Sequence, residues 1–195
     1  MEGKTLLIEE RIKESIEVKK RILEDKNLLS KIKTAAEIIV NSLKNGGKII
    51  LCGNGGSAAD AQHIAAELLG KYLMDRKPLA ALALTTNTSV LTAIGNDYSF
   101  DQIFVRQFEA VAKPQDVLIG ISTSGNSANV VNVVKAARQM NIKTICIAGS
   151  NGGKLKDLCE VLINIPSEST PRIQESHIMV GHILCELVES ELFGK

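Results

Sequence analysis

Two side chains capable of metal binding or acid–base chemistry stand four positions apart, His63 and Glu67. Residues at this spacing share one face of an α-helix, so the imidazole and the carboxylate would be neighbours. Such pairs also arise by chance on helix surfaces. Because this pair follows the glycine-rich stretch "CGNGGSAAD" at 52–60, a catalytic or metal-binding role and an ordinary surface pair stand as equal alternatives.

The glycine-rich stretch comes directly after the apolar run "KIIL" at 48–51. A glycine turn between a strand and a helix lets backbone N–H groups approach an anion, and the helix start adds its positive dipole end. Gly53, Gly55 and Ala58 match a dinucleotide pattern, but the next strand ends in "TTN" at 85–87, without the acidic residue that binds a ribose. A small phosphorylated metabolite therefore fits better than a nucleotide.

A second junction, "STSGNSAN" at 122–129, gathers hydroxyl side chains around Gly125. These are Ser122, Thr123, Ser124 and Ser127. Helix capping explains one polar residue here but hardly four hydroxyls in six positions, so a phosphate pocket is favoured. The stretch "GSNGGKL" at 149–155 is no nucleotide P-loop, because leucine stands where a magnesium-binding hydroxyl is needed.

The last helix-like stretch, 172–193, carries Gln174, His177 and His182 among apolar residues. Gln174 and His182 are separated by about 12 Å of helix rise, which would stretch both side chains toward one small ligand. The residues alone therefore favour a polar face that contacts water or neighbouring helices.

Five apolar runs predict five strands, at 48–53, 79–85, 116–122, 143–149 and 161–166. Helical patterns lie between and after them, clearest at 57–74, 126–140 and 172–193. Alternating strands and helices indicate a parallel sheet, and strands without period-two alternation suit a sheet covered on both faces. The expected fold class is thus α/β, a three-layer α/β/α sandwich in which both glycine and serine turns open on the carboxyl edge of the sheet.

The chain is expected to form one domain, 1–195, with helices over 1–46 ahead of an α/β core over 47–195. Ile8, Ile12 and Ile16 form an apolar stripe at helical spacing. The stripe either packs on the chain's own sheet or, as we favour, supplies contacts between subunits.

Composition excludes several classes of protein. A net charge of +1 and 3% aromatic residues argue against a nucleic-acid partner. The charged start of the chain lacks a signal-peptide core and no stretch is long enough to span a membrane, so a cytoplasmic location is expected. The scattered cysteines form no CxxC pair, which argues against a cysteine zinc site and for reduced, structural thiols at Cys52, Cys146, Cys159 and Cys185.

Three stretches, "CGNGGSAADAQHIAAEL" at 52–68, "ISTSGNSANVV" at 121–131 and "RIQESHIMVGHI" at 172–183, closely resemble the phosphoheptose isomerase family of the sugar isomerase (SIS) domain superfamily. The likeness runs from about Leu28 to Phe193. It implies a flavodoxin-like fold and homotetramers with active sites between subunits. It also implies conversion of sedoheptulose 7-phosphate to D-glycero-D-manno-heptose 7-phosphate, the first committed step toward the heptose of bacterial lipopolysaccharide and related surface glycans.

The resemblance further implies one zinc ion per subunit, held by His63, Glu67, Gln174 and His182. Glu67 is then the catalytic base and His182 the acid–base partner. Substrate contacts fall on Asn54, Gly55, Gly56, Glu67, Asn96, Asp97, Ser122, Thr123, Ser124, Ser127 and Gln174. The alternative is a non-catalytic binding protein of the same superfamily, like the DnaA initiator-associating protein. That protein lacks the residues corresponding to Glu67 and His182, both of which are present here.

Overall fold

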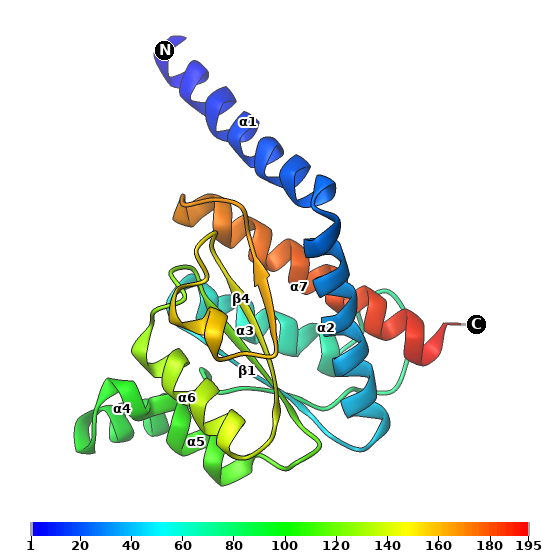
Figure 1. Ribbon diagram of the computed structural model, residues 1–195, viewed down its shortest axis with the longest axis vertical. Helices are drawn as coiled ribbons and strands as arrows, with labels where there is room; N and C mark the ends of the chain where they lie inside the picture. Colours follow the sequence, from blue (N-terminus) through cyan, green and yellow to red (C-terminus); the bar gives the residue numbers. More distant parts are fainter. Residues whose placement is uncertain (1, 195) are drawn as a thin grey trace.

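A computed structural model describes residues 2–194 of the chain (Figure 1). Its centre is a parallel sheet in the order β2-β1-β3-β4-β5. The strands are β1 (Ile49–Gly53), β2 (Ala81–Ala83), β3 (Val117–Ser122), β4 (Lys143–Ala148) and β5 (Val161–Asn164). The helices are α1 (Glu2–Glu24), α2 (Lys26–Lys44), α3 (Gly56–Leu69), α4 (Thr88–Asp97), α5 (Ile103–Val111), α6 (Ala128–Gln139) and α7 (Thr170–Phe193), with short 3₁₀ helices at Phe100–Gln102 and Gly153–Asp157. This strand order is that of a flavodoxin-like doubly wound sheet, and it confirms the predicted fold class.

Alternate residues of the central strands point into separate cores on the two faces of the sheet. In β1, Ile49 and Leu51 join the core under α2, α3 and α7, whereas Ile50 and Cys52 join the core under α5 and α6. Every residue of β1 and β3 is buried. Burial on both faces explains why these strands lack the polar alternation of a half-exposed sheet.

The helix after the glycine loop is shorter than the sequence pattern predicts. The pattern extended it to Met74, but α3 ends at Leu69, where Gly70 follows, and residues 70–80 form a loop that leads to β2. The predicted helices over 126–140 and 172–193 are confirmed to within two residues at each end. Helices α4 and α5, between β2 and β3, have no counterpart among the elements predicted most clearly from the sequence.

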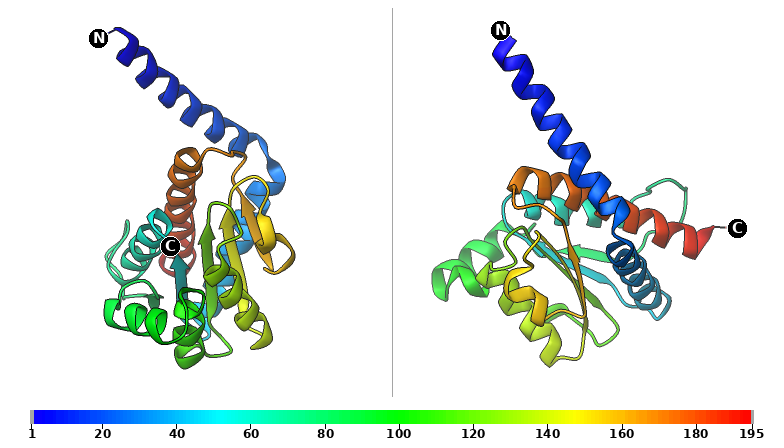
Figure 2. Two further views of the ribbon diagram at one scale, coloured as in Figure 1. Left: turned by 90° about the vertical axis from the view of Figure 1, so that its left-hand side faces the viewer. Right: turned by 45° about the horizontal axis from the view of Figure 1, so that its top comes forward.

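The first helix projects from the rest of the molecule in all views (Figures 1 and 2). The stripe of Ile8, Ile12 and Ile16 is 60%, 55% and 48% exposed. The interpretation that this stripe packs on the chain's own sheet is therefore wrong. Within residues 2–194, no helix has the length and apolar character needed to cross a membrane.

Candidate metal centre and anion-binding loops

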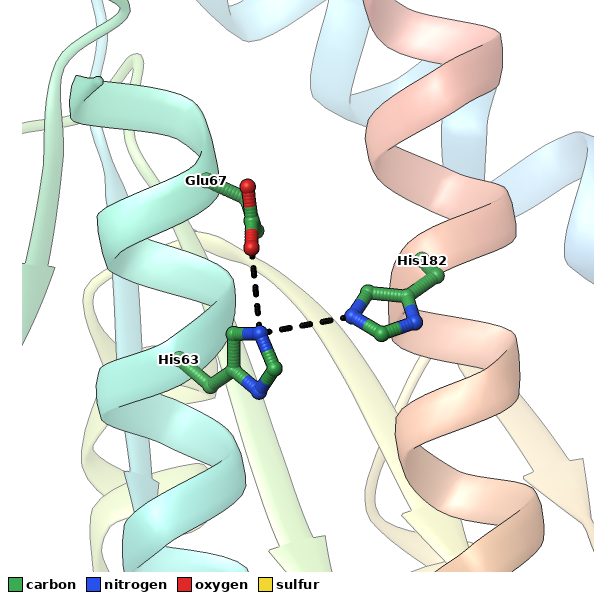
Figure 3. Close-up of side chains that lie close together, drawn as sticks. All are labelled: His63, Glu67 and His182. Carbon is green, nitrogen blue, oxygen red and sulfur yellow. Dashed lines mark hydrogen bonds and ion pairs between the residues drawn. The ribbon is translucent and has the colours of Figure 1, made fainter. Parts of the chain in front are cut away.

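Three ionisable side chains meet between α3 and α7 (Figure 3). His63 Nε2 lies 3.0 Å from Glu67 Oε1 and 3.4 Å from His182 Nε2. His63 and Glu67 lie one turn apart on α3, as their spacing predicts, and His182 reaches them from α7. The two imidazole rings meet edge to face, with 4.9 Å between ring centroids and 79° between planes.

The donor atoms of these three side chains lie within 4.8 Å of one another. Two imidazole nitrogens and one carboxylate oxygen form a donor set that suits zinc, and a catalytic zinc site keeps a further position open. The residues present therefore fit a metal ion. The third histidine, His177, is fully buried elsewhere on α7, and burial lowers its pKa to about 4.

Gln174 lies on α7 and contacts the start of α3, whereas Glu67 lies near the end of α3. A Cβ atom at Gly56 would lie 2.5 Å from Gln174 Nε2, so the glutamine side chain occupies space that Gly56 leaves open at the start of α3. The helices α3 and α7 pack side by side, with Gln174 next to residue 56 and His182 next to residue 63. Gln174 thus lies beside the glycine loop, and its place among the metal ligands stays a prediction.

One acidic residue beside this cluster was missed by sequence reasoning. Asp60 lies one turn before His63 on α3, and its Oδ2 is buried with no hydrogen-bond partner among the described residues. Burial raises the pKa of this carboxyl to about 6, against the opposing effect of His63. The spacing of Asp60, His63 and Glu67, which puts all three on one helix face, is the signal that could have found it.

The glycine loop is built for close backbone approach. Gly55 has φ +55°, in the region that favours glycine, and a Cβ at Gly53 would lie 2.6 Å from the Ser57 carbonyl oxygen. The side chains of Asn54 and Asn129 exchange two hydrogen bonds of 2.8 and 2.9 Å. Because Asn129 lies on the first turn of α6, this pair joins the glycine loop to the serine-rich turn, which confirms that both turns open on one edge.

The serine-rich turn lies against the loop after β4. Ser122 and Ser127 hydroxyls are 3.0 Å apart, and Ser127 caps α6 without a hydrogen bond from its side chain to the helix. A Cβ at Gly125 would overlap the backbone of Gly152. A cleft of about 380 Å³ opens beside this contact. Its walls include Thr123, Ser124, Asn126, Ser150, Ser167 and Thr170. The cleft is polar and has the size of a small anionic ligand.

Two predicted substrate contacts lie outside these loops. Asn96 and Asp97 end α4, where both are exposed and Asn96 Nδ2 donates to Asp97 Oδ1 at 2.9 Å. Figure 1 shows α4 at the lower left edge of the molecule. Among the described residues, no hydrogen bond or ion pair joins Asn96 or Asp97 to the three-residue cluster.

Comparisons with known proteins agree with these features. The SIS domain family matches residues 12–149. The phosphoheptose isomerase of Clostridium acetobutylicum is 56% identical over 188 residues, 96% of each chain, and phosphoheptose isomerase 2 of Campylobacter jejuni is 50% identical over 100% of this chain and 97% of its own. Among solved structures, the phosphoheptose isomerase of Neisseria gonorrhoeae has a TM-score of 0.90 at 46% identity, over 95% of this chain and 98% of that one. That of Francisella tularensis has a TM-score of 0.92 at 36% identity, over 96% and 98%. The chain belongs to the phosphoheptose isomerase family of SIS-domain proteins.

Proposed function

We propose that this protein is an aldose–ketose isomerase that converts sedoheptulose 7-phosphate to D-glycero-D-manno-heptose 7-phosphate. The observation that carries the proposal is the meeting of His63, Glu67 and His182 between α3, which follows the glycine loop, and α7, in a chain about half identical to proteins named for this substrate class. The non-catalytic alternative is not favoured, because Glu67 and His182 are both present and close together.

Zinc is the metal that this donor set suits best, with one ion per subunit held by His63, Glu67 and His182 and completed by Gln174. When bound, such an ion supplies Lewis-acid polarisation of the sugar's carbonyl and hydroxyl oxygens. The support for Gln174 is that it lies on the same helix as His182, with its amide against Gly56 at the start of the helix that carries His63 and Glu67.

Isomerisation of a ketose to an aldose needs a base that removes a proton from the carbon beside the carbonyl, giving an enediol, and an acid that returns a proton to the neighbouring carbon or oxygen. Glu67 is the base in this proposal, and His182 is the acid–base partner. A carboxylate bound tightly to a metal is a weak base, so either Glu67 would leave the metal to reach the substrate, or the metal would be partly structural. The position of Glu67 one helical turn from His63 on a half-exposed face leaves room for that movement.

The two loops contact different parts of the substrate. Ser122, Thr123, Ser124 and Ser127 hold the phosphate, where hydroxyls and the start of α6 supply donors without a lysine or arginine. Asn54, Gly55 and Gly56 lie along the sugar chain. The amide of Asn54 is already paired with Asn129, so its contribution is chiefly through the backbone.

The complete site takes residues from more than one subunit of a homotetramer. Asn96 and Asp97 end α4 and contact each other rather than the cluster, so in this proposal they reach a substrate bound by a neighbouring subunit. The exposed stripe of α1 supplies subunit contacts. The enzyme acts in the cytoplasm, on the route to heptose-containing surface glycans.

Incubation of the protein with sedoheptulose 7-phosphate, followed by ¹H and ¹³C NMR, tests the proposal. We expect conversion to an equilibrium mixture containing the 7-phosphate of the aldoheptose. Binding without turnover, together with capture of a replication initiator in a pull-down, would instead support the non-catalytic alternative.

A further inference from the structure

The loop between α3 and β2 holds an aromatic ring against His182. The Tyr72 ring is stacked on the imidazole of His182, with 5.8 Å between centroids and 27° between planes. The ring of His63 meets the same imidazole edge to face, with 4.9 Å between the two ring centroids. Rotation of a histidine ring about its Cβ–Cγ bond is only broadly restrained by its own covalent structure. These two ring contacts therefore determine where the Nε2 atom of His182 points.

A buried carboxylate fixes the backbone of the Tyr72 loop. Glu189 is 1% exposed, and its carboxylate accepts hydrogen bonds from the backbone N–H groups of Leu73 at 2.7 Å, Met74 at 3.0 Å and Tyr72 at 3.4 Å. Glu189 follows His182 by two helical turns on α7, so the two side chains leave the same helix face. The helix that carries His182 thus also holds the loop that stacks on it.

Arg76 joins the same loop to the other ligand-bearing helix. Its Nε donates to Glu189 at 2.8 Å, and its remaining nitrogens donate to the backbone oxygens of Glu67 and Leu68 at 2.9 and 2.8 Å. These carbonyls belong to the last turn of α3, where the helix leaves acceptors without partners and favours a cation. The Arg76 side chain is 2% exposed. One buried ion pair therefore connects both helices that supply the cluster.

We infer that Tyr72 is a positioning residue for His182. Its ring holds the imidazole so that Nε2 faces His63 and Glu67, and the Arg76–Glu189 pair holds Tyr72 in place. The inference rests on the proposed function, because it takes His182 to be a metal ligand. Groups that orient a metal ligand commonly change metal affinity by about 10- to 100-fold, which sets the expected size of the effect.

Four variants of the full chain distinguish the effect of ring stacking by Tyr72 from the effect of its side-chain volume. Tyr72→Phe keeps the ring, Tyr72→Leu keeps apolar bulk without a planar ring, and Tyr72→Ala removes both. Leu73→Ala is the matched control, since Leu73 lies on the same loop and is 65% exposed. The probe is zinc alone, titrated in competition with a chromophoric chelator, with melting temperature and steady-state kinetics measured alongside.

We expect zinc to bind roughly 10-fold or more weakly to Tyr72→Leu and Tyr72→Ala, and with wild-type affinity to Tyr72→Phe and Leu73→Ala. At saturating zinc, kcat falls in the Leu and Ala variants while KM stays near the wild-type value, because Tyr72 orients His182 and does not bind substrate. Wild-type zinc affinity in Tyr72→Leu, or equal loss in Tyr72→Phe, would overturn the inference. The zinc titration needs no turnover, so a wild-type chain that binds zinc without isomerising the sugar would refute the proposed function separately.

Discussion

His63 and His182 face each other from different helices with their Nε2 atoms 3.4 Å apart. Two neutral imidazole nitrogens at this distance cannot both present lone pairs, so the pair requires a proton or a cation between them. The Glu67 carboxylate, 3.0 Å from His63, adds an anionic oxygen to the same cluster. A metal ion held by all three side chains would accept lone pairs from both rings in place of a proton between them.

Metal removal gives the first prediction. Dialysis against a strong chelator is expected to abolish isomerase activity, and added zinc is expected to restore it. Elemental analysis by mass spectrometry should find zinc in the wild-type chain and little in His182→Ala. The control is Cys159→Ser, which alters a half-buried thiol outside the cluster and should keep its zinc. Full activity in metal-free protein would remove zinc from the mechanism.

Replacing the base while keeping its shape tests the role of Glu67. Glu67→Gln retains side-chain volume but cannot accept a proton at neutral pH, so turnover is expected to fall by about two orders of magnitude or more. Calorimetry should still detect binding of the sugar phosphate, and circular dichroism should show an unchanged fold. Near-normal turnover would contradict the assignment of the base.

The Asn54–Asn129 pair predicts coupling between the two loops. Asn129 is 2% exposed, so Asn129→Ala leaves the amide of Asn54 without its partner at a largely buried site. We expect a loss of about 1–3 kcal/mol in the free energy of unfolding and a raised KM. A double-mutant cycle with Asn54→Ala, followed by urea unfolding, measures the pair directly. Additive effects of the two substitutions would show that the loops are independent.

The buried carboxylate of Glu189 predicts a pH dependence of stability. Burial alone would raise its pKa, but hydrogen bonds from Leu73, Arg76, Met74 and Tyr72 together lower it below the ordinary value. The folded state therefore binds this proton more weakly than the unfolded state does. The stabilisation is complete above the unfolded pKa of about 4.3 and is lost as the pH falls through the lower folded value.

Glu189→Gln should accordingly lower the free energy of unfolding at pH 7 by about 3–5 kcal/mol, because it leaves the buried Arg76 without its counter-charge. Urea unfolding at a series of pH values should show the two proteins converging below about pH 4. Lys44→Ala, which removes an exposed ion pair with Glu191, is the control and should change little. A difference that stays constant down to pH 3 would contradict the lowered pKa.

The exposed stripe of α1 predicts the behaviour of the chain in solution. The double variant Ile8→Lys, Ile12→Lys places two charges on this stripe. We expect light scattering to give a lower particle mass for it than for the wild type, with helix content retained. Lys13→Ala, on a charged position of the same helix, is the matched control. An unchanged mass in the double variant would exclude this stripe as a subunit contact.

Much of the fold and of the site follows from local sequence. The strands were predictable because the sheet is buried on both faces and its apolar runs are continuous. His63 and Glu67 were predictable as neighbours because helical spacing alone sets their separation. The end of α3 at Leu69 was missed because Tyr72, Leu73 and Met74 extend the apolar pattern. The hydrogen bonds that hold this loop come from Arg76 within it and from Glu189, 115 positions beyond Met74.

The approach of His182 to His63 lies beyond local sequence, because 119 positions separate the two residues. Only the packing of α3 on α7 brings them together. The exact fit depends on Gly181, where a Cβ would lie 2.7 Å from Ile64 Cδ1. The resemblance to a known family therefore supplied what the residue patterns could not, namely which of several polar side chains on the last helix belong to the site.

The contact of Gly125 with Gly152 and Gly153 restricts how the substrate range of this enzyme can be changed. Beside the cleft, Gly125 packs against Gly152 and Gly153, and a Cβ at any of the three positions would overlap a neighbouring atom. Substitution at these glycines would disrupt the contact between the two loops before it reshaped the cleft beside them. Variation has to come from the opposite wall, at Ser167, Glu168 and Thr170, where side chains already line the space. Libraries of variants for new ketose phosphates should therefore change the residues just before and at the start of α7 and keep the three glycines.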